Sequence, residues 1–198
     1  MTGQMEDASG DPVDSRAGDR LWRRAASFAA QMHQHQMRKD RRTPYVAHPA
    51  RVAMTVRDTF GVTDPAAIAA AFLHDTIEDT PADYDDIDER FGSEIARLVA
   101  ALTKNMLLPE QEREADYDAR LTRADWRARL IKLADVLDNA EDIETRPDAR
   151  SPAVTRRHVD RIDRILKMAE PDTRSHAEVT RAVVIVKAAR AELVDRAG

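Results

Sequence analysis

Apolar residues recur at helical spacing along almost the whole chain, and patterns typical of strands are nearly absent. From Asp19 onward the apolar positions follow the spacing of a buried helical stripe. Short β-branched runs such as residues 183–186 lie inside longer helical patterns, so they do not predict strands. The pattern therefore predicts an all-α helical bundle without internal repeats.

Proline, glycine and capping residues indicate where the expected helices begin and end. One expected helix runs unbroken from Asp64-Pro65 to Thr80-Pro81. Residues 104–118 are polar and are expected to be loop in part. The expected helices span residues 19–32, 48–61, 64–80, 83–91, 95–102, 129–144, 158–169 and 177–194. Residues 1–17 lack periodicity, which predicts a disordered tail before one domain over residues 18–198.

The composition of the chain excludes some classes of protein and some kinds of metal site. The chain of 198 residues is long enough for one domain with a sizeable core. It has no cysteine, which excludes disulfides and thiolate metal sites. The net charge of −5, with signs well mixed, argues against general nucleic-acid binding. No apolar run resembles a signal peptide or a membrane span, so we expect a soluble cytoplasmic protein, while a homo-oligomer is left open.

The run Leu73-His-Asp-Thr-Ile-Glu-Asp79 is the densest group of reactive side chains in the sequence. In a helix, His74 and Glu78 would share one face, as would Asp75 and Asp79. A core helix would not tolerate these groups without partners. The adjacent His-Asp pair can bind one metal ion, and the acidic pair one turn later can take protons beside it. The run predicts a metal-dependent phosphohydrolase.

Two further segments supply candidate ligands, His48 near the start of one expected helix and Asp135 inside another. These positions lie far from the pair His74-Asp75 in the sequence, so only a bundle that brings three helices together could place them on one ion. Two imidazoles and two carboxylates suit Mn²⁺, Fe²⁺ or Zn²⁺ better than Mg²⁺, which prefers oxygen ligands.

These residues and the stretches around them resemble a known family. The candidate ligands match the H…HD…D signature of HD-domain metal phosphohydrolases, and the flanking stretches resemble the hydrolase domain of the RelA/SpoT family. Those stretches are residues 38–40, 43–49, 73–80, 90–92 and 132–135. The chain is most similar to the stand-alone small alarmone hydrolases, which consist of that domain only. We therefore expect no synthetase domain.

The resemblance implies a role for each matching residue. It implies four ligands for one Mn²⁺: His48, His74, Asp75 and Asp135. Glu78 and Asp79 match the acidic pair that handles the catalytic water and the proton transfer. Arg38 and Lys39 match the basic pair near the substrate phosphates and base, and Asn139 matches a position that contacts the nucleotide. The implied reaction releases pyrophosphate from the ribose 3′ oxygen of ppGpp or pppGpp, giving GDP or GTP.

Several departures from the family pattern concern the substrate. After Asp135 the family frequently carries a basic residue, whereas this chain has Val136, and Asp138 precedes Asn139. Arg42 and Thr43 occupy the place where a glycine often precedes the Pro-Tyr pair, and residues 153–169 lack the aromatic residue that often lines the nucleotide pocket. The alternatives left open are a hydrolase for another nucleotide, such as a phosphatase acting on NADPH or a deoxynucleotide, and a non-catalytic nucleotide sensor. The intact pair Glu78-Asp79 argues against the sensor, because carboxylates near phosphates repel them.

Overall fold

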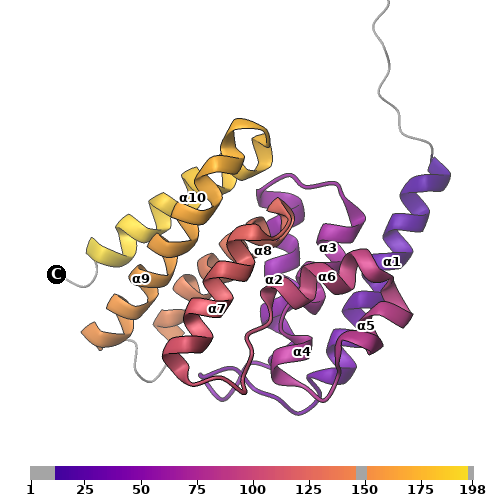
Figure 1. Ribbon diagram of the computed structural model, residues 1–198, viewed down its shortest axis with the longest axis horizontal. Coiled ribbons are helices and arrows are strands. Elements are labelled where there is room, and N and C mark those ends of the chain that lie inside the picture. The colour runs from indigo at the N-terminus through magenta and orange to yellow at the C-terminus, as the bar shows by residue number, and fades with distance from the viewer. Residues whose placement is uncertain (1–11, 146–150, 196–198) are drawn as a thin grey trace, which may run out of the picture.

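The computed structural model describes residues 12–145 and 151–195, which form a bundle of helices (Figure 1). The α-helices are α1 (Pro12–Met32), α2 (Ala47–Met54), α3 (Pro65–Leu73), α4 (Thr76–Asp79), α5 (Tyr84–Phe91), α6 (Ser93–Leu102), α7 (Glu110–Arg123), α8 (Trp126–Glu141), α9 (Pro152–Ala169) and α10 (Ala177–Asp195). A π-helical turn, Thr55–Thr59, continues α2, and 3₁₀ turns follow α8 and α9. In these residues the β-structure is limited to an isolated bridge between Met37 and Pro44. The predicted all-α fold is confirmed.

Helices α3 and α8 form the centre of the bundle. Seven of the nine residues of α3 are buried, and α8 is buried over most of its length. Helices α1, α2 and α6 contact α3, while α2, α9 and α10 contact α8. In Figure 1, α9 and α10 lie side by side at one end of the molecule and α1 lies at the other. Within the described ranges, no helix has the length and apolar character needed to cross a membrane.

Local sequence fixes several helix ends at the predicted places. Asp64 accepts a hydrogen bond from the Ala66 amide (2.9 Å), and Pro65 occupies the first turn of α3, a favoured arrangement at helix starts. Asp83 and Asp86 form a reciprocal capping box at the start of α5. Gly92, with φ of +88°, separates α5 from α6 in a conformation that favours glycine.

Two expectations about the chain need correction or a boundary change. The helix expected over residues 64–80 is broken, because α3 ends at Leu73 and α4 begins at Thr76. Residues 104–118 are loop in part, as expected: residues 104–109 lie outside the helices, and α7 begins at Glu110. Helix α7 has few buried apolar residues and so lacks a clear stripe. The tail predicted for residues 1–17 lies outside the described residues up to residue 11, and α1 already begins at Pro12.

Candidate metal centre and active site

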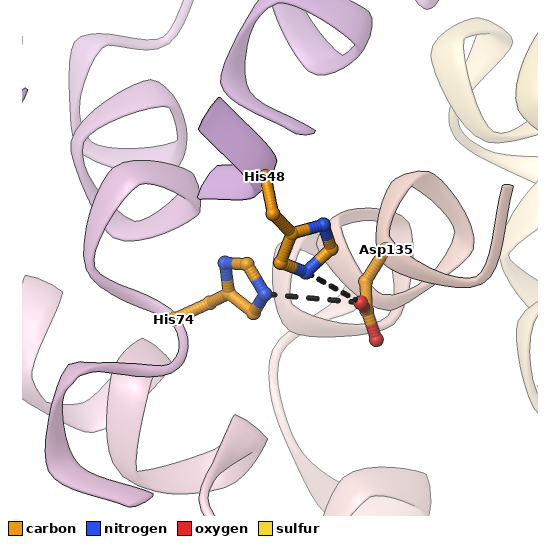
Figure 2. Close-up of side chains that lie close together, drawn as sticks. All are labelled: His48, His74 and Asp135. Carbon is orange, nitrogen blue, oxygen red and sulfur yellow. Dashed lines mark ion pairs between the residues drawn. The ribbon is translucent and has the colours of Figure 1, made fainter. Parts of the chain in front are cut away.

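The four residues predicted to hold a metal come together at one point. His48 comes from α2, the pair His74-Asp75 from the turn between α3 and α4, and Asp135 from α8. Figure 2 shows the two imidazoles directed toward the Asp135 carboxylate. Asp135 Oδ1 lies 3.1 Å from His48 Nε2 and 3.8 Å from His74 Nε2. One ligand atom from each of these three residues fits within a group 4.8 Å across.

The break between α3 and α4 explains how two adjacent residues face the same point. Neighbouring side chains on a regular α-helix point about 100° apart, since the helix has 3.6 residues per turn. In the turn, Asp75 Oδ2 lies 3.2 Å from His74 Nε2 and 3.5 Å from His48 Nε2. The correction to the predicted helix is thus what brings Asp75 into the group.

The hydrogen bonds of both imidazoles leave Nε2 facing the other candidate ligands. His74 Nδ1 lies 2.8 Å from the Ala71 carbonyl oxygen, which only accepts, so Nδ1 carries the hydrogen. His74 Nε2 is buried and has no hydrogen-bond partner among the described residues, although Asp75 is close. His48 Nδ1 lies 2.7 Å from Asp138 Oδ2. Buried nitrogen lone pairs beside two carboxylates fit a divalent cation.

The carboxylates give this group a strong preference for positive charge. Burial alone would raise the pKa of Asp135, but Lys132 and His48 hold that pKa well below its ordinary value. Burial likewise opposes protonation of His48, yet the hydrogen bonds to Asp135 and Asp138 raise the pKa of its ring. Protons and a metal cation therefore compete for the same nitrogen atoms.

A cavity of about 440 Å³ opens beside the group. Its walls come from the segment after α1, from α4, and from helices α7, α8 and α9. All the predicted site residues except the buried His74 line it: Arg38, Lys39, His48, Asp75, Glu78, Asp79, Asp135 and Asn139. Eight of the nine predicted site residues therefore line one cavity.

The acidic pair differs in its surroundings. Glu78 is partly buried, and burial raises the pKa of its carboxyl group, while Glu78 Oε2 accepts a hydrogen bond from the Lys104 amide (2.8 Å). Asp79 is exposed, and its Oδ2 accepts a hydrogen bond from the Tyr45 hydroxyl (2.9 Å). Both carboxylates thus border the cavity from α4 with defined orientations.

Two of the predicted substrate-binding residues, Arg38 and Asn139, are linked to Asp135 by side-chain hydrogen bonds. Arg38 Nη2 donates to Asn139 Oδ1 (3.0 Å) and to Asp142 Oδ2 (2.8 Å). Asn139 in turn donates to Asp135 Oδ1 (2.6 Å). Lys39 is exposed at the cavity wall. Arg38 and Asn139 therefore support a candidate ligand as well as lining the cavity.

Sequence reasoning missed several residues that the structure places at the site. Tyr45 lies in a matching stretch but had no assigned role, although it contacts Asp75 and Asp79. Asp138 follows Asp135 at a helical spacing of three, which was the available signal for it. Arg161 lines the cavity from α9, where no sequence motif pointed to it.

Residues 25–162 match the family described as HD domain. The chain belongs to the HD-domain family. The chain is also similar in sequence to proteins that are named for an enzymatic activity. It is 40% identical over 121 residues to the guanosine-3′,5′-bis(diphosphate) 3′-pyrophosphohydrolase MESH1 of Xenopus tropicalis, covering 61% of this chain and 68% of that protein. The human MESH1 is 41% identical over 120 residues, with 60% and 67% covered.

A longer bacterial protein and a solved structure are also similar to this chain. The guanosine-3′,5′-bis(diphosphate) 3′-pyrophosphohydrolase of Aquifex aeolicus is 40% identical over 123 residues, which cover 61% of this chain but 17% of that protein. A structure described as a metazoan ortholog of SpoT that hydrolyzes ppGpp superposes with a TM-score of 0.70 at 26% identity, covering 90% of this chain and 96% of that one. The predicted family resemblance is confirmed.

Proposed function

We propose that this HD domain hydrolyses ppGpp and pppGpp, releasing pyrophosphate from the ribose 3′ position to give GDP or GTP. The observation that carries the proposal is the meeting of His48, His74, Asp75 and Asp135 beside a cavity that Glu78 also lines. Relatives named for this reaction share about two fifths of their aligned residues with the chain, as the 40% and 41% identities indicate. A cluster of metal-binding residues in a cavity next to an acid is the arrangement that metal-assisted hydrolysis requires.

We assign the divalent cation to His48, His74, Asp75 and Asp135, and we propose Mn²⁺, with Fe²⁺ and Zn²⁺ as alternatives. The set of two nitrogen and two oxygen donors suits these ions. When bound, such an ion supplies a Lewis acid that makes nearby water a stronger acid and offsets negative charge on phosphate oxygens.

The acidic pair provides the proton transfer in this proposal. A water oxygen forms a bond to the phosphorus on the ribose 3′ oxygen, and the bond between that phosphorus and the 3′ oxygen breaks. Glu78 and Asp79, acting together, take the proton from water, and the departing 3′ oxygen gains a proton to become a hydroxyl group. A carboxyl group whose pKa is raised by burial, as in Glu78, is better matched to proton exchange near neutral pH.

Positively charged and amide side chains hold the substrate. Arg38 and Lys39 lie on the cavity wall beside the metal group, where they stabilise charge that builds on the phosphate oxygens. Asn139, one turn after Asp135, contacts the nucleotide from α8. Arg38 keeps its contact with Asn139, so the two residues position each other.

The test is turnover of ppGpp by the purified protein with added Mn²⁺, with pyrophosphate and phosphate measured separately. Release of pyrophosphate that is lost in His74→Ala and in Asp75→Ala is the expected result. Folded protein that binds Mn²⁺ but releases no pyrophosphate would contradict the substrate assignment. A panel with NADPH and deoxynucleotides would then identify phosphatase activity. The cytoplasmic location and a homo-oligomer remain predictions from the sequence.

A further inference from the structure

Asp138 is a buried acid that the proposed reaction does not use. It lies on α8 one turn after Asp135, and 4% of its surface is exposed. Burying a carboxylate is unfavourable unless it is paired and hydrogen-bonded. Here the unfavourable effect is increased, because Asp75 and Asp135 already place negative charge on the other side of His48.

The partners of Asp138 account for both of its carboxylate oxygens. Asp138 Oδ2 lies 2.7 Å from His48 Nδ1 and accepts from Arg51 Nη2 at 2.9 Å. Asp138 Oδ1 accepts from Arg51 Nε at 2.5 Å. Arg51 therefore makes the two-pronged contact that suits guanidinium and carboxylate groups, and it balances the buried charge.

The geometry places His48 between two kinds of acid. Its Nε2 faces the candidate ligands Asp75 and Asp135, and its Nδ1 faces Asp138 on the opposite edge of the ring. Arg51 comes from the same helix as His48, three residues later, so one helical turn supplies both the ring and the cation that holds Asp138. Among the described residues, Nδ1 of the other imidazole, His74, contacts a neutral backbone carbonyl and no carboxylate.

We infer that Asp138, held by Arg51, is a positioning residue that fixes the ring of His48 for metal binding. Its carboxylate keeps hydrogen on Nδ1, directs the Nε2 lone pair toward the cation and makes that nitrogen a stronger donor. Outer partners of this kind orient metal-bound histidines, and their loss weakens metal affinity by roughly 10- to 100-fold. The inference rests on the metal site of the proposed function but not on the identity of the substrate.

The test compares Mn²⁺ affinity without substrate, measured by titration calorimetry on protein stripped of metal. Asp138→Asn keeps the size and one acceptor oxygen but loses the charge, whereas Asp138→Ala loses both. We expect Mn²⁺ affinity to fall about tenfold in Asp138→Asn and closer to 100-fold in Asp138→Ala. The rise in melting temperature on adding Mn²⁺ should shrink in the same order.

Asp172→Asn is the matched control, because Asp172 is also held by an arginine, Arg129, but contacts none of the proposed ligands. A general loss of stability would lower the melting temperature in the control and leave its Mn²⁺ affinity unchanged. Wild-type Mn²⁺ affinity in both Asp138 variants would overturn the inference. If the wild-type protein binds no Mn²⁺, both the inference and the proposed metal site are wrong. If it binds Mn²⁺ but does not hydrolyse ppGpp, only the proposed substrate is wrong.

Discussion

The Tyr45 hydroxyl lies 2.9 Å from Asp79 Oδ2, although the two residues are 34 positions apart in the sequence. The same oxygen lies 2.7 Å from Asp75 Oδ2, so Tyr45 connects a proposed metal ligand with a proposed catalytic acid. Burial and the nearby charge of Asp75 raise the pKa of Tyr45 well above its ordinary value. The hydroxyl therefore stays protonated and acts as a donor throughout the working pH range.

Tyr45→Phe should lower turnover without removing the metal. The ring would keep its stacking on His33, at 4.7 Å between centroids, so the local packing is preserved. Loss of a hydrogen bond to a charged group removes about 1.5 kcal/mol or more, which corresponds to roughly a tenfold fall in kcat. Steady-state kinetics with ppGpp, together with Mn²⁺ titration, will check this. Unchanged kcat would show that the hydroxyl does not orient the carboxylates during the reaction.

Glu78→Gln and Asp79→Asn should each reduce kcat by at least 100-fold, the usual contribution of a positioned acid or base. Because the two residues are proposed to act together, the double variant should be little slower than the slower single variant. Mn²⁺ affinity should remain near that of the wild type, since neither residue is assigned as a ligand. Full turnover in both single variants would remove the pair from the mechanism.

The sequence was sufficient to predict the meeting of the ligands but not the turn that allows it. Apolar spacing predicted most helices, and the H…HD…D pattern identified four residues that the structure brings together. The helical spacing of apolar residues continues through Leu73 into residues 74–79, so no local sequence signal predicted that α3 would end at Leu73. The break follows from tertiary contacts, because His74 and Asp75 must face the same group of side chains.

Contacts between distant segments were likewise not predictable from pattern. The bonds from Arg38 to Asn139 and Asp142 join residues about a hundred positions apart. A charge run beside a proline usually indicates a solvated surface, and only the fold shows that Arg38 is largely covered. Helix α7 was not predicted because its buried residues are only Tyr117 and Leu121, too few to give a clear apolar periodicity.

Arg129→Met should destabilise the fold. Arg129 is buried and donates to the carbonyl oxygens of Leu121, Thr122 and Ala124, and it also binds Asp172. Breaking a buried charge pair from one side typically costs about 3–5 kcal/mol. The free energy of unfolding from urea denaturation will measure this. Arg190→Met, which removes a surface pair with Asp163, should cost less than about 1 kcal/mol, and equal losses would contradict the assignment.

The turn that carries the basic residues should lose a stabilising interaction in acid. Asp40 accepts hydrogen bonds from the Thr43 hydroxyl (2.6 Å) and from the amides of Arg42 and Thr43, and these bonds lower its pKa to about 2. Because the folded pKa lies below the ordinary value of 3.8, the contribution is present above that pH and disappears as pH falls toward 2. Carboxyl NMR titration should give a midpoint near 2, and a midpoint near 4 would show that the turn is open.

Arg161→Ala should weaken substrate binding more than it slows the chemical step. Arg161 lines the cavity from α9, and within the described part of the chain its side chain has no ion pair or hydrogen bond. Among the other cavity cations, Arg38, Lys104, Lys132 and Arg164 already contact acidic side chains. Lys39, the remaining one, also has an interaction of its own. A substrate with several phosphate charges therefore gains most from Arg161, because binding there displaces no internal partner.

The expected result is a rise of about tenfold in KM for ppGpp, equivalent to one charge-assisted hydrogen bond, with kcat changed by less than about threefold. Arg157→Ala is the matched control, because Arg157 is exposed on the same helix but does not line the cavity. A KM that rises equally in both variants would indicate a general effect of net charge rather than a contact. Higher salt should reduce a general effect in both variants, whereas a direct contact should keep Arg161→Ala distinct from its control.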